Sequence, residues 1–408
     1  MSEILFLAHR VPFPPNRGDK IRSANILRKL ARMAPVHVGC FSENADDRAG
    51  GREVEALAKT ACIPNRSKPL VLAGAEAVLA GKPVSLTAFH SPRLMRWVRE
   101  TIDAHPVSTI VVFSGQMGQY VPDDFAGRVV IDLCDVDSAK FEGYAAAGHR
   151  VWLNEREGRL LAREEERLAV RAHSTLLISD NEAALFKSRL EYPSAANVKV
   201  MGNGIDAATF DPASVSPQFD VVKRKGPHFV FTGQMDYPPN EDAALWAIAH
   251  FLPAIREGYP DAELHIVGRA PTKALLAEKG RRGVTVWGEV ADVKPFIAAA
   301  DAVVAPLMIA RGVQNKVLEA MAMAKPVLLT PEAATGIDAQ DGKHWLVSNA
   351  DGDAMAARIE SMLKNPALAG EMGSAARQFV LDHHAWDAML APLEEWVVLN
   401  GAETRNAA

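Results

Sequence analysis

Short apolar segments alternate along the first half of the chain with longer segments whose apolar residues recur at helical spacing. Apolar runs of strand length between such segments indicate a parallel sheet with crossover helices. Helices are expected at residues 21–33 and 52–60. The strand candidates are residues 3–8, 35–41, 108–114, 128–135, 174–179 and 197–203. These elements predict one doubly wound α/β domain, an N-terminal Rossmann-like domain over residues 1–211.

The same alternation starts again after residue 227. Proline, serine and charged residues interrupt the pattern at 212–227, which is typical of a linker. A second Rossmann-like domain is predicted over 228–385, with helices at 241–255 and 317–324. A terminal helix at 386–400 is expected to return to the N-terminal domain. The five strand candidates of the second domain are residues 227–233, 262–268, 284–288, 302–307 and 326–330.

Length and composition agree with two globular domains. The chain has 408 residues, of which 48% are hydrophobic and 23% charged, and a net charge of -5. That charge gives no electrostatic signature for nucleic acid, so no nucleic-acid partner is expected. Three cysteines at unrelated spacings indicate neither a disulfide framework nor a metal cluster. The start of the chain lacks the features of a signal peptide, and a cytoplasmic protein is predicted.

The loop after the first strand is a candidate ligand site, because ligands of open α/β sheets bind beyond the carboxyl ends of the strands. Gly18 permits close approach of backbone, and Arg17, Lys20 and Arg22 surround it at the start of a helix. Such a loop suits a diphosphate or an anionic acceptor. A solvated basic turn is the alternative. No G-x-G-x-x-G follows any strand, which argues against an NAD-dependent dehydrogenase.

A more specific group of residues lies between 310 and 330. Gly312 lets backbone approach a ligand, and Lys316 and Glu319 share one face at the start of a helix. A cation near the free N–H groups of a helix N-terminus suits a pyrophosphate, and Glu319 could accept hydrogen bonds from ribose hydroxyls. An ordinary surface ion pair between Lys316 and Glu319 is the alternative.

Four segments, VMGNGIDAATFDP, HIVGRAP, VTVWGEVADVKPFIAAADAVVAPL and NKVLEAMAMAKPVLL, resemble in this order the retaining glycosyltransferase family 4. FLAHRVPFPPNRGDKIRS, FSGQMGQYVP, DLCDVDSAK, FTGQMDYPPNEDA and ARGVQNK are similar, more narrowly, to sugar transferases of PEP-CTERM/exosortase exopolysaccharide systems. The resemblance implies the GT-B fold, in which an N-terminal acceptor domain and a C-terminal nucleotide-sugar donor domain face a central cleft. It also implies catalysis without a metal or other cofactor.

The resemblance assigns roles to individual residues. Gly18 would lie against the donor phosphates and Lys316 beside the diphosphate. Glu319 matches the second glutamate of the family's E-x7-E motif, which contacts ribose, and the loops at Gly268 and at 288–293 would frame the base. The implied catalytic residues are Lys316 and Arg311. The implied donor-binding residues are Gly18, Gly233, Gln234, Gly268, Val290, Gly312, Val313, Asn315, Lys316 and Glu319.

Three departures from the family pattern change the prediction. Arg311 stands eight residues before Glu319, where the family has a glutamate that contacts the donor sugar. Gln234 replaces a common arginine for the diphosphate, and the lysine usual a few residues later is replaced by the segment 238–240. Ser114 and Gln116 occupy the loop where many relatives place a histidine. The phosphate charge is therefore expected to be met by Lys316, Arg311 and the loop around Gly18.

Other polar residues are assigned to the acceptor or phosphate side. Asp137 ends an Asp-Val-Asp triplet that imitates a metal-binding D-x-D motif, although lining the cleft or capping the next helix is the preferred interpretation. His9 ends the first strand and could face the cleft, or could serve as a structural hydrogen-bonding residue. The full set is His9, Arg17, Lys20, Arg22, Ser114, Gln116 and Asp137.

The preferred hypothesis is transfer of a hexose, with retention, from a UDP- or GDP-sugar to a glycan or polyprenyl-linked acceptor in exopolysaccharide or lipid-linked glycan synthesis. Basic helices at 17–32 and 93–99 suit peripheral contact with the inner membrane surface, although solvated helix faces explain them as well. The alternatives are a GT-B sugar-nucleotide epimerase, a degenerate nucleotide-sensing scaffold without turnover, and a periplasmic-type binding protein.

Overall fold

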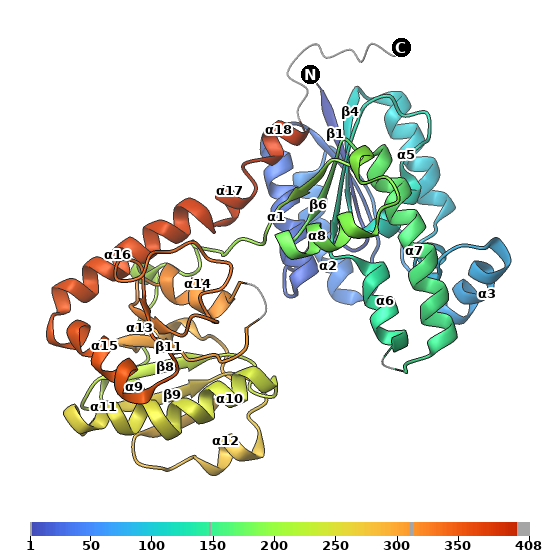
Figure 1. The fold of residues 1–408 in the computed structure, drawn as a ribbon. Helices are drawn as coiled ribbons and strands as arrows, with labels where there is room; N and C mark the ends of the chain where they lie inside the picture. The colour runs from blue at the N-terminus through green and yellow to red at the C-terminus, as the bar shows by residue number, and fades with distance from the viewer. Residues whose placement is uncertain (1, 147, 311–312, 398–408) are drawn as a thin grey trace. The chain divides into compact units, whose positions relative to one another are not determined.

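The computed structural model describes residues 2–146, 148–310 and 313–397 (Figure 1). The chain divides into two compact units. Unit 1 consists of Met1–Asn203 together with Met389–Ala408, and unit 2 consists of Gly204–Ala388. Each unit is built around one parallel β-sheet, so the predicted α/β class with two Rossmann-like domains is confirmed.

Unit 1 has a seven-stranded sheet in the order β3-β2-β1-β4-β5-β6-β7, and every strand pair is parallel. The interior strand β1 is buried along its whole length, which is why it reads as a continuous apolar run. Its strands are β1 Glu3–Ala8, β2 Val36–Cys40, β3 Thr60–Cys62, β4 Val107–Phe113, β5 Arg128–Cys134, β6 Ser174–Leu177 and β7 Val198–Val200.

Helices cover the sheet of unit 1, and several begin at a side-chain cap. Asn44, Ser91 and Ser179 each accept a hydrogen bond from the backbone N–H three residues later, which satisfies a free donor of the helix that follows. The helices are α1 Gly18–Met33, α2 Ala45–Leu57, α3 Leu70–Ala80, α4 Val84–Ala88, α5 Pro92–Ala104, α6 Asp137–Ala146, α7 Val151–Arg171 and α8 Asp180–Arg189, with 3-10 turns at Gly115–Tyr120 and Pro193–Ala195.

Unit 2 repeats the architecture with a six-stranded parallel sheet in the order β10-β9-β8-β11-β12-β13. The chain reverses its direction of winding between β8 and β11, and this switch point is where ligands of doubly wound sheets bind. Its strands are β8 His228–Thr232, β9 Glu263–Val267, β10 Val284–Gly288, β11 Ala302–Ala305, β12 Val327–Leu329 and β13 Leu346–Val347.

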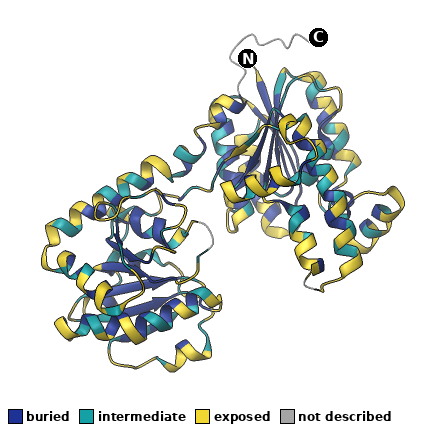
Figure 2. Ribbon diagram, in the orientation of Figure 1, coloured by how far each residue is buried: buried dark blue, intermediate teal, exposed yellow. Residues whose placement is uncertain are grey.

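The helices of unit 2 enclose the larger of the apolar cores, in which Phe229, Phe251 and Leu318 are almost fully buried (Figure 2). They are α9 Phe219–Val222, α10 Pro238–Trp246, α11 Leu252–Gly258, α12 Lys273–Ala277, α13 Lys294–Ala299, α14 Asn315–Ala322, α15 Gly352–Lys364, α16 Pro366–His383 and α17 Trp386–Met389. A 3-10 turn lies at Pro212–Ser214, and a π-helical turn at Ala247–Phe251 joins α10 to α11.

The segment 212–227, predicted as a linker, belongs instead to unit 2. It forms α9, whose Val221 is fully buried against Phe296 in a small core of its own. The two units separate earlier than expected, after Asn203 instead of Asp211. Val215 packs against the larger core and Val221 against Phe296, and two valines among many polar neighbours are too weak a signal to see in the sequence.

Residues Met389–Val397 of the C-terminal segment belong to unit 1. The segment differs from the single helix expected at 386–400, because α17 ends at Met389 and α18 Leu393–Val397 begins after Pro392. Proline lacks the N–H that a continuous helix would need. The hydroxyl of Thr109 donates to the carbonyl oxygen of Val397 at 2.6 Å, and α18 contacts β5. Among the described residues, no helix has the length and apolar character to cross a membrane.

Candidate active site

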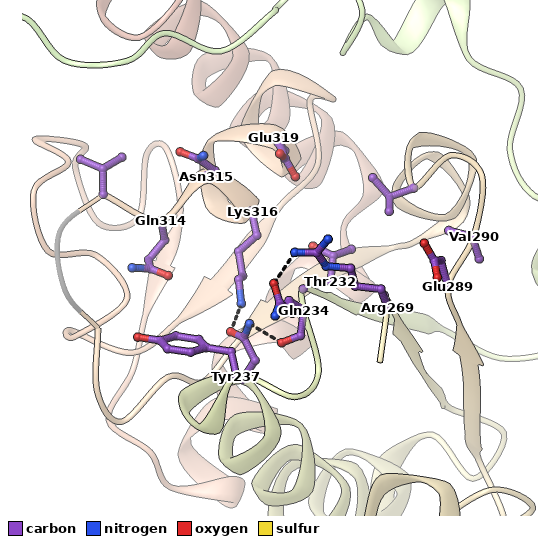
Figure 3. A pocket seen from close by; sticks show the side chains of 15 residues that line it. Thr232, Gln234, Tyr237, Arg269, Glu289, Val290, Gln314, Asn315, Lys316 and Glu319 are labelled. Carbon is purple, nitrogen blue, oxygen red and sulfur yellow. Dashed lines mark hydrogen bonds between the residues drawn. The ribbon is translucent and has the colours of Figure 1, made fainter. Parts of the chain in front are cut away.

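The carboxyl end of the unit 2 sheet carries a hollow of about 570 Å³ (Figure 3). The loops after β8, β9 and β10 line it, together with the first turns of α14. These loops meet there because all strands of a parallel sheet end at the same edge. Eight predicted donor-binding residues line the hollow: Gly233, Gln234, Gly268, Val290, Val313, Asn315, Lys316 and Glu319. Arg311 and Gly312 lie outside the described residues.

Two glycines let the loops after β8 and β9 touch each other. The N–H of Gly233 donates to Val267 at 3.1 Å, and the N–H of Gly268 donates to Gly288 at 2.9 Å. A Cβ on Gly268 would lie 1.7 Å from the carbonyl oxygen of Gly233, a distance that no side chain tolerates. Glycine at 268 is therefore required for the floor of the hollow to close.

Lys316, the second residue of α14, points its ammonium group into the hollow (Figure 3). Its Nζ donates to Oδ1 of Asn240 at 2.5 Å and lies 4.5 Å from the centre of the Phe231 ring. Burial lowers the pKa of Lys316 to about 8, and Glu319 opposes that shift. Asn240 itself is held by Nδ2, which donates to the carbonyl oxygen of Gln234 at 2.9 Å. The cation is thus oriented by an amide and keeps its charge.

Glu319 lies one helical turn after Lys316 on the same face of α14. Burial raises the pKa of its carboxyl group, while the charges of Lys316 and Lys294 lower it. The structure therefore brings a hydrogen-bond acceptor and a cation to one wall of the hollow. That pair suits a ligand that combines hydroxyl groups with an anion.

Arg269 is a pocket residue that the sequence analysis missed. It follows Gly268, lines the hollow, and donates from Nη2 to Oε1 of Gln234 at 2.5 Å. Gln234 stands where the family pattern has an arginine, and the structure places a guanidinium directly beside it from the next strand. The segment HIVGRAP contained the signal, since its arginine follows a strand-ending glycine.

Asn240 was also missed as a site residue. In the sequence it belongs to the segment 238–240, which replaces the lysine usual in the family. In the structure its side chain is largely buried and is the hydrogen-bond acceptor of Lys316. Asparagine near the start of a helix is common for structural reasons, so nothing in the sequence pointed to this role.

Asp19 contacts two of the predicted residues of unit 1, His9 and Arg17, and also Arg10. Its carboxylate lies 3.2 Å from Nε2 of His9 and accepts hydrogen bonds from Arg10 at 2.7 Å and from Arg17 at 2.7 Å. Burial opposes ionisation of Asp19, but the hydrogen bonds from His9 and Arg10 outweigh it and lower the pKa of the carboxyl group. His9 also stacks on Phe113, the last residue of β4, with ring centroids 5.6 Å apart.

Lys20 and Arg22 are not available to a ligand, contrary to the prediction. The ammonium group of Lys20 is buried and donates to Asp47 at 2.5 Å. Arg22 is 2% exposed and donates to both carboxylate oxygens of Asp132, at 2.7 Å and 3.2 Å. It also donates to the carbonyl oxygen of Met201 at 2.7 Å. These two side chains join distant segments of unit 1, and buried carboxylates neutralise their positive charges.

The remaining predicted residues of unit 1 lie in the segments that follow β1, β4 and β5. Ser114 follows β4 with a positive φ of 78° and donates to Gln116 at 2.7 Å. Asp137 begins α6, and burial raises the pKa of its carboxyl group. Gly18 is the first residue of α1, and a Cβ there would meet nothing within 4 Å. No neighbouring atom therefore requires glycine at this position, and contact of Gly18 with the donor phosphates stays a prediction.

Among the described residues, two clusters offer metal-type ligands, one in each unit, and each lies toward the amino ends of the strands of its own sheet. One is Glu3 with His37 and His105, and the other is His228 with Glu263 and His265. Their polar atoms are engaged: Trp287 donates to His265 at 3.2 Å, and Arg224 donates to Glu263 at 2.7 Å. Burial, with the charges of His228 and Arg224, lowers the pKa of His265 to about 3.

Residues 226–365, which include the hollow, match the family model for glycosyl transferases group 1. Unit 2 therefore contains a domain of this type. The chain is 27% identical over 222 residues to the putative glycosyltransferase EpsD of Bacillus subtilis, an alignment that covers 52% of this chain and 57% of that protein. The chain thus spans little more than half the length of this curated relative.

Solved structures resemble nearly the whole chain. Sucrose-phosphate synthase from Thermosynechococcus elongatus has a TM-score of 0.56 at 17% identity, with 97% of this chain and 98% of that chain covered. Anabaena HepE in complex with UDP has a TM-score of 0.58 at 16% identity, with 97% and 99% covered. The chain has the GT-B fold. At these identities the likeness shows the fold alone.

Proposed function

We propose that the chain is a retaining glycosyltransferase that moves a hexose from a UDP- or GDP-sugar to a hydroxyl acceptor. The observation that carries this proposal is the hollow of unit 2, where Lys316 and Glu319 face two glycine-built loops at the switch point of the sheet. The group 1 match over the same residues supports it, as does the UDP bound by HepE.

Charge stabilisation is the proposed contribution of the hollow to catalysis. Negative charge grows on the diphosphate as it leaves the sugar, and a fixed cation stabilises that charge more than it stabilises the donor. Lys316 is held for this purpose by Asn240, and Arg269 brings a second cation to the same hollow. Retention without a protein nucleophile would require the acceptor to attack from the face of the leaving group.

Binding roles follow for the remaining residues. Glu319 would accept hydrogen bonds from ribose hydroxyls, and the loop at 288–293 would frame the base, with Val290 in its wall. We propose a glycan or polyprenyl-linked acceptor, and a place in exopolysaccharide or lipid-linked glycan synthesis, on the resemblance to PEP-CTERM-associated transferases. Catalysis is proposed to need no metal, so EDTA should leave turnover unchanged.

The test is an NMR assay of the full chain with α-linked UDP-glucose and GDP-mannose, and with octyl glycosides and polyprenyl-diphosphate sugars as acceptors. We expect one donor to be consumed, an α-linked product to form, and the Lys316→Ala variant to lose this activity. A β-linked product would exclude retention. Conversion of the donor sugar without an acceptor would favour an epimerase, and nucleotide binding without turnover would favour a scaffold.

A further inference from the structure

Helix α3, which belongs to unit 1, has an exposed apolar face. Leu70 is 65% exposed, Val71 86% and Leu79 89%, while only Ala73 and Ala77 of this helix are buried (Figure 2). Soluble proteins seldom expose so many large apolar side chains on one short helix unless the surface binds something. The helix is held to the fold by its small residues, and its large side chains are left free.

The only charged residue of α3 is neutralised. Glu76 accepts a hydrogen bond from Lys68 at 2.7 Å, and Lys68 also donates to the carbonyl oxygen of Thr87 at 3.1 Å. The outer face of α3 therefore has no net negative charge to oppose an anionic partner.

Basic residues lie beside this apolar face. Arg156 of α7 donates to the carbonyl oxygen of Ala77 at 2.7 Å and to that of Lys82 at 3.1 Å, which fixes α7 against the end of α3. Lys82 and Arg163 line a hollow of about 660 Å³ at the same place, and neither is in an ion pair within the part of the chain that the structure describes. Trp152, 67% exposed, lies one helical turn before Arg156.

We propose that the outer face of α3, together with Lys82, Arg156 and Arg163 beside it, docks on the surface of an anionic lipid bilayer. An eleven-residue helix is about 16 Å long, so it would lie in the plane of the interface and not cross the membrane. Apolar side chains then enter the acyl boundary, and the adjacent cations meet lipid phosphates. A tryptophan at the rim is typical of such interfaces. The inference is independent of the proposed function, because it uses no residue of unit 2.

The experiment is flotation of the full chain with vesicles of phosphatidylcholine alone and with about one third phosphatidylglycerol. We expect binding to the anionic vesicles only, weakened by high salt. The double variant Val71→Ser, Leu79→Ser should lose about tenfold or more of this binding, since each side chain stops contributing apolar area. Tyr192→Ser removes an exposed ring elsewhere on unit 1, one that is 61% exposed, and is the control.

A second pair of variants tests the charge requirement. Lys82→Glu and Arg163→Glu change exposed side chains, so the protein should fold as the parent does, and each should weaken binding to anionic vesicles severalfold. Four results would overturn the proposal. They are no binding to either vesicle, equal binding by parent and double Ser variant, binding unaffected by the charge reversals, and a dimer in light scattering that the Ser substitutions abolish.

Discussion

The two units hold their buried cations in different ways at corresponding edges of the same kind of sheet. In unit 1, Lys20 and Arg22 donate to the carboxylates of Asp47 and Asp132. In unit 2, Lys316 donates to the amide of Asn240 at 2.5 Å. A carboxylate cancels the charge of its partner, whereas an amide oxygen only directs it.

The more exposed cation of the hollow follows the same pattern. Arg269 donates to the amide of Gln234 at 2.5 Å, and no carboxylate of the described residues pairs with it. The basic residues after β1 therefore stabilise unit 1, while those around the hollow of unit 2 retain charge for an anion. The identity of the hydrogen-bond acceptor, more than the number of basic residues, distinguishes the two edges.

The largest effect is expected from Arg22→Ala, measured as the free energy of unfolding in urea. The change leaves Asp132 buried without its partner, which should cost about 3–5 kcal/mol. Arg17→Ala, at the exposed start of the same helix, should cost less than about 1 kcal/mol. An Arg22→Ala protein as stable as the parent would show that Arg22 is not a structural residue.

The next effect is on nucleotide binding by Lys316→Ala. Loss of the cation should raise the Kd for the nucleoside diphosphate about a hundredfold, which corresponds to about 3 kcal/mol. The free energy of unfolding should change by less than about 1 kcal/mol, because the hydrogen-bond partner of the lysine is an amide and not a carboxylate. Isothermal titration and urea unfolding measure the two quantities. A large loss of stability with unchanged Kd would show that Lys316 stabilises unit 2, as Arg22 stabilises unit 1, and does not bind the nucleotide.

Asn240→Asp would give unit 2 the arrangement of unit 1. A carboxylate beside Lys316 should raise the Kd about tenfold at pH 7, since it cancels the charge. In the parent, Lys316 loses its proton as pH rises through about 8, so affinity should fall above that pH. In the variant, the pH at which affinity falls should be higher, because the carboxylate raises the pKa of the lysine.

Asn315→Asp is the control for that experiment, because it adds the same charge to the wall of the hollow at another residue. This substitution can weaken nucleotide binding, but affinity should still fall as the pH rises through about 8. Equal pH profiles for the parent and for Asn240→Asp would mean that Asn240 does not set the charge of Lys316.

The smallest effect is expected from Gln234→Glu, which pairs exposed Arg269 with a carboxylate. The Kd should rise about threefold, because solvent already screens this arginine. Arg269→Gln should have a similar effect, because it removes the same positive charge from the hollow. Unchanged affinity in both variants would show that Arg269 does not act on the ligand.

The sheets could be predicted from the sequence because buried parallel strands appear as continuous apolar runs. All five strands expected in the second domain are present, as are the six expected in the first. The missed strands, β3 and β13, have only three and two residues. The pattern predicts residue 60 at the end of a helix, yet α2 ends at Leu57 and Thr60 begins β3.

In the candidate site, too, residues in local motifs could be predicted, whereas contacts between residues far apart in the sequence could not. Gly233, Gly268, Lys316 and Glu319 could be found because each lies in a short motif at a strand end or helix start. The partner of Arg22 could not, because Asp132 lies 110 residues away along the chain. The sequence therefore showed where cations occur but not which of them are neutralised.

The most direct test of the account is isothermal titration of UDP and GDP into the parent chain and into Lys316→Ala, with EDTA present throughout. The account predicts that the parent binds one of the two nucleotides without a metal, and that Lys316→Ala binds it about a hundredfold more weakly. Failure of the parent to bind either nucleotide, or equal affinity in parent and variant, would contradict a donor site in the hollow of unit 2.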